Sequence, residues 1–171
     1  MSLPPPGTDA YPPAIYTGDS GEASAVVRPY AAEPDLVYPN AGRVHYLSRG
    51  SSTGGLFGLY RWEFGTGVSG PDPHFHRTMT ESFYILDGEV EIHDGRSWVT
   101  THAGDYVHVP AGGIHGFKHR ADGPASMLLH FAPGAPREAY FEGLARVAAG
   151  ERMSDTERDA FMREHDNLWS E

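Results

Sequence analysis

Three histidines and one glutamate in the middle of the chain have the chemistry to hold a metal ion. His74 and His76 are two residues apart, Glu81 follows shortly after, and His115 comes later in the same strand-rich region. Three imidazole nitrogens and one carboxylate oxygen make a ligand set for one divalent transition metal, with positions left open for a small molecule. A set without sulfur suits Fe, Mn, Ni, Co, Cu or Zn, and the residue types do not choose among them.

The spacing of these residues constrains the backbone that carries them. On a β-strand, residues i and i+2 point to the same face, so His74 and His76 can share one ion. Glu81 lies an odd number of residues past His76, so the segment 77–80 must turn or bulge if Glu81 is to face the same interior. A glutamate on the apolar strand that contains Phe83 is costly to bury without a cation or several hydrogen-bond donors.

The composition excludes several classes of function. The 171 residues carry a net charge of −10 with a single lysine, Lys118, so we expect no nucleic-acid partner and no membrane partner. The absence of cysteine excludes disulfides, thiolate metal sites and cysteine nucleophiles. No apolar run reaches the ~20 residues of a membrane helix, and residues 1–7 lack the features of a secretory signal, so a cytoplasmic location is expected.

Alternation and turn signals predict an all-β core between an extended arm and a helical tail. Residues 1–42 hold eight of the fourteen prolines, which predicts a Pro-rich N-terminal arm that drapes over the domain or a neighbouring subunit, or begins as a mobile tail. Many short strands over residues 43–131 favour a sandwich or barrel. Residues 132–171 follow a breaker, and apolar spacing and a capping box predict two short helices there. The expected strands are 43–48, 56–64, 74–77, 82–86, 89–93, 96–102, 105–109, 114–119 and 126–131, and the expected helices are 137–149 and 154–165.

Two linked motifs resemble the signatures of the cupin superfamily. The run His74-x-His76-x4-Glu81-x6-Gly88 is similar to the first signature, and the run Gly104-x5-Pro110-x-Gly112-x2-His115 is similar to the second. The fifteen residues between the two runs match the short spacing in small bacterial cupins. Two linked motifs at this spacing are far more specific than either one alone.

The resemblance implies a fold and a ligand set. It implies a single conserved jelly-roll β-barrel over residues 43–131, and it implies that the metal ligands are His74, His76, Glu81 and His115. Two positions depart from the family pattern, because Val68 stands where a glycine is usual and His119 where an asparagine is usual. Neither departure removes a metal ligand. His119 is a candidate for one of two roles, a partner that contacts a metal ligand or a catalytic base that faces the cavity. The alternative is a metal-free barrel whose histidines are only buried and hydrogen-bonded; for His108 and His130 that core role is the better interpretation.

The resemblance also implies an activity. The chain is most similar to quercetinase-like single-domain cupins, which implies a metal-dependent dioxygenase whose small enol or aromatic substrate chelates the metal through an oxygen. Glu81 or His119 would then act as the catalytic group that manages the proton. The alternatives are a non-oxidative polyketide cyclase or isomerase, and a module that binds a small ligand without turnover. Because such barrels have exposed edges and the family commonly pairs them, we expect a homodimer.

Overall fold

The computed structural model describes residues 11–120 and 122–169, and the chain divides into two units. The first unit is Met1–Tyr30, and its described residues, 11–30, contain no helix or strand. The Tyr16 hydroxyl in this unit donates a hydrogen bond to the Ser20 carbonyl at 2.6 Å. The second unit begins at Ala31. The Pro-rich arm expected over residues 1–42 stays a prediction, and its first ten residues lie outside the described part.

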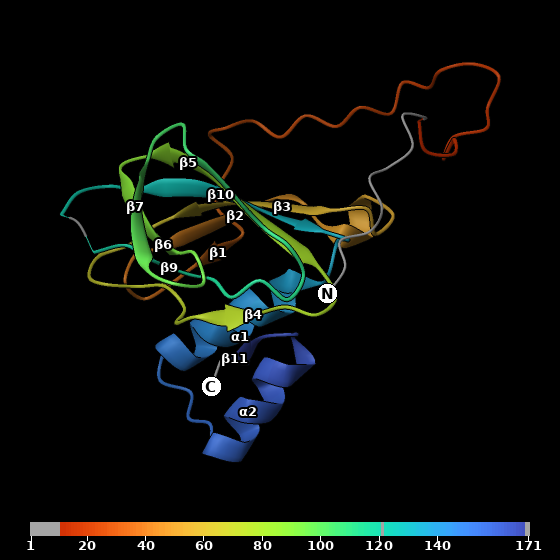
Figure 1. Cartoon of the computed structure of the whole chain (residues 1–171). Coiled ribbons are helices and arrows are strands. Elements are labelled where there is room, and N and C mark those ends of the chain that lie inside the picture. Colours follow the sequence, from red (N-terminus) through yellow and green to blue (C-terminus); the bar gives the residue numbers. More distant parts are fainter. Residues whose placement is uncertain (1–10, 121, 170–171) are drawn as a thin grey trace. The chain divides into compact units, whose positions relative to one another are not determined.

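Short strands make up most of the second unit, and both α-helices lie near its C-terminal end, before the last strand (Figure 1). The strands are β1 (Leu36–Val37), β2 (Arg43–Ser48), β3 (Gly58–Glu63), β4 (His74–Phe75), β5 (Thr80–Asp87), β6 (Glu89–His93), β7 (Trp98–His102), β8 (Tyr106–Val109), β9 (Gly116–Lys118), β10 (Ser126–Ala132) and β11 (Leu168–Trp169). The helices are η1 (Gly50–Ser52), α1 (Arg137–Ala148) and α2 (Asp155–Glu164). The two predicted helices are confirmed, and so are the predicted strands, with shifts of a few residues at their ends.

The strands form a jelly roll of facing antiparallel sheets, which confirms the all-β prediction. The larger sheet has the order β1-β2-β3-β10-β5-β8, and a smaller one has the order β7-β6-β9. Strand β11 pairs with β4, and a bridge between His74 and His115 joins β4 to the residues just before β9. Two segments far apart in the chain, the C-terminal strand and the strand of the first histidine motif, therefore lie side by side.

Alternating burial along β5 and β10 defines the inner face of the larger sheet. On β10, Met127, Leu129 and Phe131 are buried, whereas the residues between them are half-buried on the opposite face. On β5, Glu81 and Phe83 are buried on the face that these β10 residues also occupy. Glu81 thus points into an apolar interior, as the strand pattern predicted.

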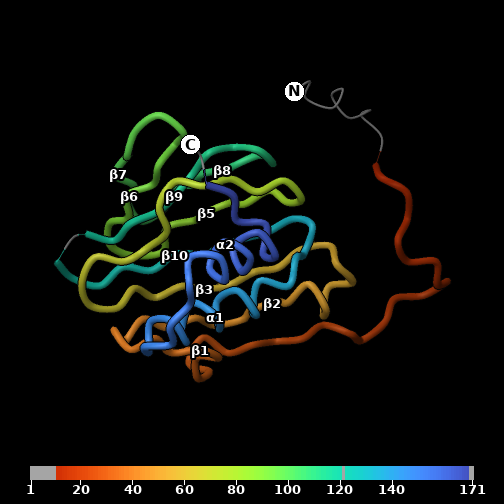
Figure 2. Tube along the Cα trace, turned by 90° about the horizontal axis from the view of Figure 1, so that it is seen from below, coloured from red at the N-terminus to blue at the C-terminus, as the bar shows by residue number. Residues whose placement is uncertain are grey.

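The two α-helices lie on one side of the strands, as Figure 1 and the view from below in Figure 2 both show. Helix α1 packs its Phe141 ring against Tyr60 and Trp62 of β3, with ring centroids 5.2 and 5.4 Å apart. Helix α2 begins with the predicted capping box, in which Ser154 and Glu157 satisfy each other's backbone N–H groups. No helix in the described part of the chain is long and apolar enough to cross a membrane.

Candidate metal centre

Backbone pairing brings the three histidines of the candidate site together. The N–H of His74 donates to the carbonyl of His115, and the N–H of His115 donates to that of His74, both at 2.8 Å. His76 lies two residues further along, with its ring centroid 5.0 Å from that of His74 and 5.1 Å from that of His115. Gly112 donates its N–H to the His76 carbonyl at 2.7 Å. Its φ of +82° lies in the left-handed region of backbone conformation, which favours glycine.

Glu81 reaches the same point from the next strand because the chain leaves the strand conformation between β4 and β5. The turn that the odd spacing requires is held by the Asp166 carboxylate. Its Oδ2 accepts the backbone N–H of Arg77 at 2.9 Å, and the backbone N–H and hydroxyl of Thr78, both at 2.8 Å. The C-terminal segment therefore sets the geometry of the turn that brings Glu81 to the histidines.

Each of the three imidazole rings is oriented by a backbone carbonyl at its Nδ1. The pairs are His74 with Asp72 at 2.9 Å, His76 with Asp166 at 2.6 Å and His115 with Gly113 at 2.9 Å. Because a carbonyl oxygen only accepts, each Nδ1 must carry a proton, and Nε2 is the ring nitrogen that can bind an ion once it carries no proton. Metal-binding histidines are usually fixed in this way, by a hydrogen bond from the nitrogen that does not bind the metal.

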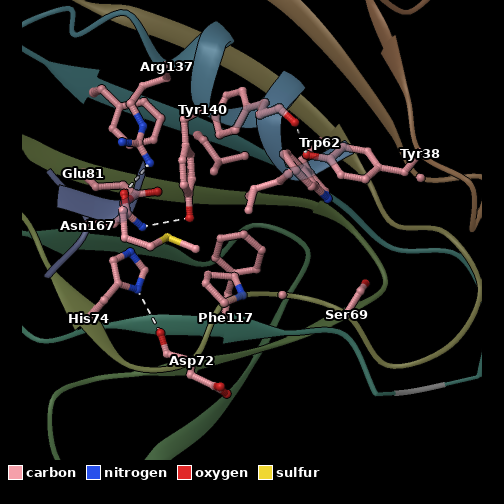
Figure 3. A pocket seen from close by; sticks show the side chains of 18 of the residues that line it. Tyr38, Trp62, Ser69, Asp72, His74, Glu81, Phe117, Arg137, Tyr140 and Asn167 are labelled. Carbon is pink, nitrogen blue, oxygen red and sulfur yellow. Dashed lines mark hydrogen bonds between the residues drawn. The ribbon is translucent and has the colours of Figure 1, made fainter. Parts of the chain in front are cut away.

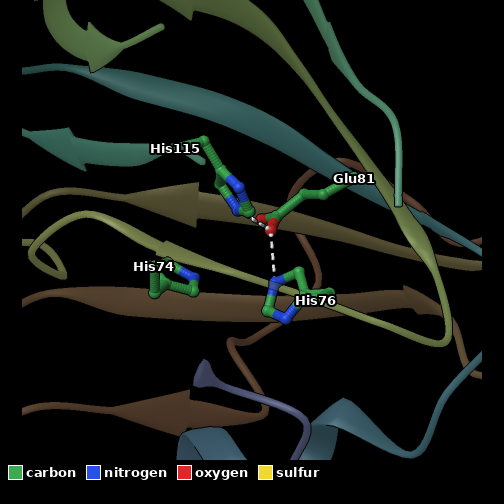
Figure 4. Close-up of side chains that lie close together, drawn as sticks. All are labelled: His74, His76, Glu81 and His115. Atoms are coloured by element: carbon green, nitrogen blue, oxygen red, sulfur yellow. Dashed lines mark hydrogen bonds and ion pairs between the residues drawn. The ribbon is translucent and has the colours of Figure 1, made fainter. Parts of the chain in front are cut away.

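The four side chains converge closely enough to share one ion (Figure 4). One ligand atom from each of the four lies within 4.8 Å of the others. The Oε2 atom of Glu81 is 2.8 Å from His115 Nε2 and 3.0 Å from His76 Nε2. Two ligands held at about 2.1 Å from one metal, at right angles, are about 3 Å apart. The arrangement therefore fits a divalent metal, and no other cluster of this kind occurs among residues 11–120 and 122–169.

Burial and mutual charge set the protonation of the cluster. Burial, together with the charge of His115, lowers the pKa of His74 to about 3. Burial alone would raise the pKa of Glu81, but hydrogen bonds from His115 and His76 hold it below its usual range. Burial alone would lower the pKa of His115, but its hydrogen bond to Glu81 raises it. The site thus combines a neutral imidazole with an ionised carboxylate, the forms in which both groups bind metals.

A cavity of about 300 Å³ opens beside these ligands, and His74 and Glu81 form part of its wall (Figure 3). Most of the remaining lining is aromatic or aliphatic, and the tail supplies a large share of it. The apolar lining includes Trp62, Phe117, Leu129, Phe131, Phe141, Leu144, Met162 and Trp169, and the polar lining includes Tyr38, Arg137, Tyr140 and Asn167. An apolar pocket with a few converging polar groups is the form that small-molecule sites usually take.

The other histidines singled out in the sequence lie elsewhere. His119 is buried, but it is not among the residues that line the cavity, and its two ring nitrogens contact the carbonyls of Glu89 and Gly123 at 3.2 and 3.0 Å. His108 is exposed and contacts the Ser82 hydroxyl at 3.1 Å, so the core role expected for this residue is wrong. His130 is half-buried on the outer face of β10, against Phe57. The structure therefore brings together the four proposed ligands but not these three residues.

Sequence reasoning missed the polar residues that the tail adds to the cavity. Arg137 and Tyr140 lie on α1, and Asn167 and Trp169 lie at or next to β11. The apolar spacing of α1 predicted a packed face that includes Tyr140 but gave no sign that its hydroxyl would reach a cavity. Strand β11 has only two residues, too few for an alternation that a sequence could reveal.

Comparisons with known proteins agree with this fold. The Cupin_2 family model, described as a cupin domain, matches residues 60–131. Quercetin 2,3-dioxygenase from Bacillus subtilis (strain 168) is 34% identical over 73 residues, which are 42% of this chain and 21% of that protein. The matched segment therefore spans about a fifth of the curated relative.

Solved structures share the fold at low sequence identity. The structure of KdgF from Halomonas sp. has a TM-score of 0.53 and 16% identity, and the match covers 63% of this chain and 91% of that one. A predicted oxalate decarboxylase from Thermotoga maritima has a TM-score of 0.53 and 23% identity, with 64% and 99% covered. These likenesses show a common fold.

The fold and site define a small jelly-roll barrel with a buried cluster of histidines and a carboxylate that can bind a metal. Residues 60–131 of this barrel, which contain both motifs, are similar to the cupin domain family, and the solved structures share its fold.

Proposed function

We propose that this protein is a metal-dependent dioxygenase that acts on a small enol or aromatic substrate, which binds the metal through an oxygen. The observation that carries the proposal is the buried set of three imidazoles and one carboxylate at the wall of an apolar cavity. The similarity of a 73-residue segment to quercetin 2,3-dioxygenase supports the oxidative chemistry. The cavity, at about 300 Å³, suits a small-molecule substrate.

The residues of the site have separate roles in this proposal. His74, His76, His115 and Glu81 hold one divalent transition metal, which when bound polarises a substrate oxygen and supplies the redox chemistry. The backbone carbonyls that fix the three Nδ1 protons keep the rings in place. Trp62 and Phe117 line the cavity and would supply apolar contacts to a planar substrate.

Glu81 is also the proton acceptor in this proposal. Both hydrogen bonds from the histidines go to its Oε2, and no hydrogen bond to its Oε1 is found among the described residues. Oε1 is therefore the carboxylate oxygen to which we assign the proton of a substrate hydroxyl. We do not assign this step to His119, because that side chain is not part of the cavity lining.

An oxygen-electrode screen tests the proposal. Protein loaded separately with Fe, Mn, Ni, Co, Cu or Zn is mixed with flavonols and with diketones, and dioxygen uptake is compared with substrate loss. We expect stoichiometric uptake with at least one redox-active metal, and none for Glu81→Gln. The matched control is Glu89→Gln, which changes an exposed glutamate near the barrel and should retain activity. Substrate loss without dioxygen uptake would instead indicate a cyclase or isomerase, and binding without substrate loss would indicate a binding module.

A further inference from the structure

Arg137 is a buried cation close to the candidate metal centre. It is 3% exposed, and none of the ion pairs found among residues 11–120 and 122–169 includes it. Its guanidinium lies 4.2 Å from the centroid of the Tyr140 ring and donates to the His165 carbonyl at 2.6 Å. A buried charge without a carboxylate partner is costly to maintain, which points to a role beyond packing.

Arg137 fixes the orientation of Asn167, and Asn167 in turn contacts Tyr140. The guanidinium only donates, so the atom of Asn167 that it contacts at 3.0 Å must be the amide oxygen. The amide nitrogen of Asn167 therefore donates to the Tyr140 hydroxyl, at 2.9 Å. Because Asn167 is 1% exposed and both ends of its amide are engaged, its orientation is fixed.

This arrangement leaves the proton of the Tyr140 hydroxyl free to donate. The hydroxyl oxygen accepts from Asn167, and no acceptor for its own proton is found in the described part of the chain. Burial raises the pKa of Tyr140 to about 12, so the proton is retained at neutral pH. Figure 3 shows this hydroxyl directed into the cavity, on the side toward His74 and Phe117.

The charges around the cavity favour a negatively charged ligand. Arg137, Arg158 and a divalent metal contribute four positive charges against the two negative charges of Glu81 and Asp72. The three metal-binding imidazoles add none when neutral. A low-dielectric cavity with an excess of positive charge favours an enolate, phenolate or carboxylate over its neutral analogue.

We propose that Tyr140 is a ligand-binding residue whose hydroxyl donates a hydrogen bond to an anionic oxygen of the molecule bound at the metal. Arg137 and Asn167 are positioning residues that hold Tyr140 in place and turn its proton toward the cavity. This inference rests on the metal site of the proposed function, but it does not depend on reaction with dioxygen.

Calorimetric titration of the zinc-loaded protein with salicylate and with salicylamide tests the inference. Wild-type protein should bind the anion more tightly than the neutral amide. Tyr140→Phe should weaken salicylate binding by roughly tenfold or more, the effect of one hydrogen bond to a charged group, and should weaken salicylamide binding less. The zinc content of this variant should stay at one per chain, which separates a lost ligand contact from a damaged metal site.

The chain offers a control in Tyr46. It is not among the residues that line the cavity, and its hydroxyl contacts the Glu142 carboxylate at 3.4 Å, so Tyr46→Phe should leave the affinity for salicylate unchanged within about twofold. Equal binding of the two probes by wild-type protein, or equal salicylate affinity in Tyr140→Phe and wild type, would overturn the inference. If no dioxygen uptake is found but the titrations give the expected differences in salicylate affinity, the oxidative chemistry is rejected and the role of Tyr140 in ligand binding is retained.

Asn167→Asp tests the positioning role. An aspartate keeps an acceptor for Arg137 but removes the donor to Tyr140 and accepts the Tyr140 proton instead. Salicylate binding should fall in this variant, and the effect should be smaller when Tyr140 is already phenylalanine, because the two changes act on one hydrogen bond. Strictly additive effects in this double-mutant cycle would show that Asn167 does not act through Tyr140.

Discussion

Glu81 is the one anion among the four proposed ligands, and its surroundings explain why it must be ionised. The side chain is 4% exposed on the apolar face of β5. The two histidine nitrogens, at 2.8 and 3.0 Å from Oε2, offset the free-energy cost of burying its negative charge. A buried carboxylate of this kind needs a cation or donors. The same residue therefore determines both the charge of the site and its affinity for a metal.

Glu81→Gln should weaken metal binding by at least roughly a hundredfold, because it removes a charged ligand from a buried site. Competition with a chromogenic chelator measures the affinity. Glu89→Gln serves as the control and should bind the metal as the wild type does. Unchanged affinity in the Glu81 variant would exclude this residue as a ligand.

Metal affinity should fall as the pH is lowered from about 8 to about 6. The metal needs a neutral imidazole, and hydrogen bonding to Glu81 raises the pKa of His115 in the metal-free protein. Below that raised pKa the metal must displace a proton, whereas above it the ring is already neutral. Calorimetry in two buffers of different ionisation enthalpy should detect proton release near pH 7; proton uptake would contradict this assignment.

At the scale of elements, the C-terminal tail contributes contacts to the candidate metal centre rather than only covering the barrel. Strand β11 pairs with β4, placing Trp169 opposite His74. Just before β11, Asp166 has a φ of +55°, a conformation that is uncommon for a residue other than glycine. Its carbonyl orients His76, and its carboxylate holds the turn at Arg77 and Thr78. One residue outside the two motifs thus positions a ligand and the approach to Glu81.

Asp166→Ala should lower metal affinity by roughly 10- to 100-fold, because it removes the carboxylate that holds the turn leading to Glu81, although it keeps the backbone carbonyl that orients His76. Glu164→Gln, an exposed change two residues earlier, should have no effect. Both proteins can be compared by chelator competition, with circular dichroism to confirm that each remains folded. If the alanine variant retains full affinity, the tail does not position the site.

The sequence predicted those helices and strands whose residue patterns lie within one short stretch of the chain. The alternation around Val90 and Ile92 predicted β6 with its observed bounds, and the capping box at Ser154 predicted the start of α2. The odd spacing of Glu81 predicted a turn after His76, although not that a distant carboxylate would hold it. The roles of Asp166 and Tyr140 depend on how the tail docks against the barrel, and no local pattern encodes that contact.

At the scale of the whole molecule, the edges of the larger sheet bear on the expected homodimer. Strands β1 and β8 are its outermost strands. Tyr84 and Tyr106 stand opposite each other on β5 and β8, 43% and 61% exposed, and Leu86 nearby is 37% exposed. Exposed aromatic side chains beside an open strand edge are a suitable surface for a second copy of the chain. We therefore propose that two copies pair through β8 and the outer face of β5.

Light scattering should give twice the mass of one chain for the wild type. Tyr106→Glu and Tyr84→Glu should shift the mass toward that of one chain, because a charge at the interface would be buried without a partner. Leu56→Glu, which alters an exposed residue away from these strands, should remain a dimer. A wild-type protein with the mass of one chain would rule out the pairing.

The most direct test of the metal site is an anomalous difference map from a crystal of metal-loaded protein, recorded at the absorption edge of the bound metal. We expect one peak per chain at about 2.0–2.2 Å from the Nε2 atoms of His74, His76 and His115 and from a carboxylate oxygen of Glu81. A peak bound by other residues, or no peak at these four side chains in a protein that carries stoichiometric metal, would contradict it.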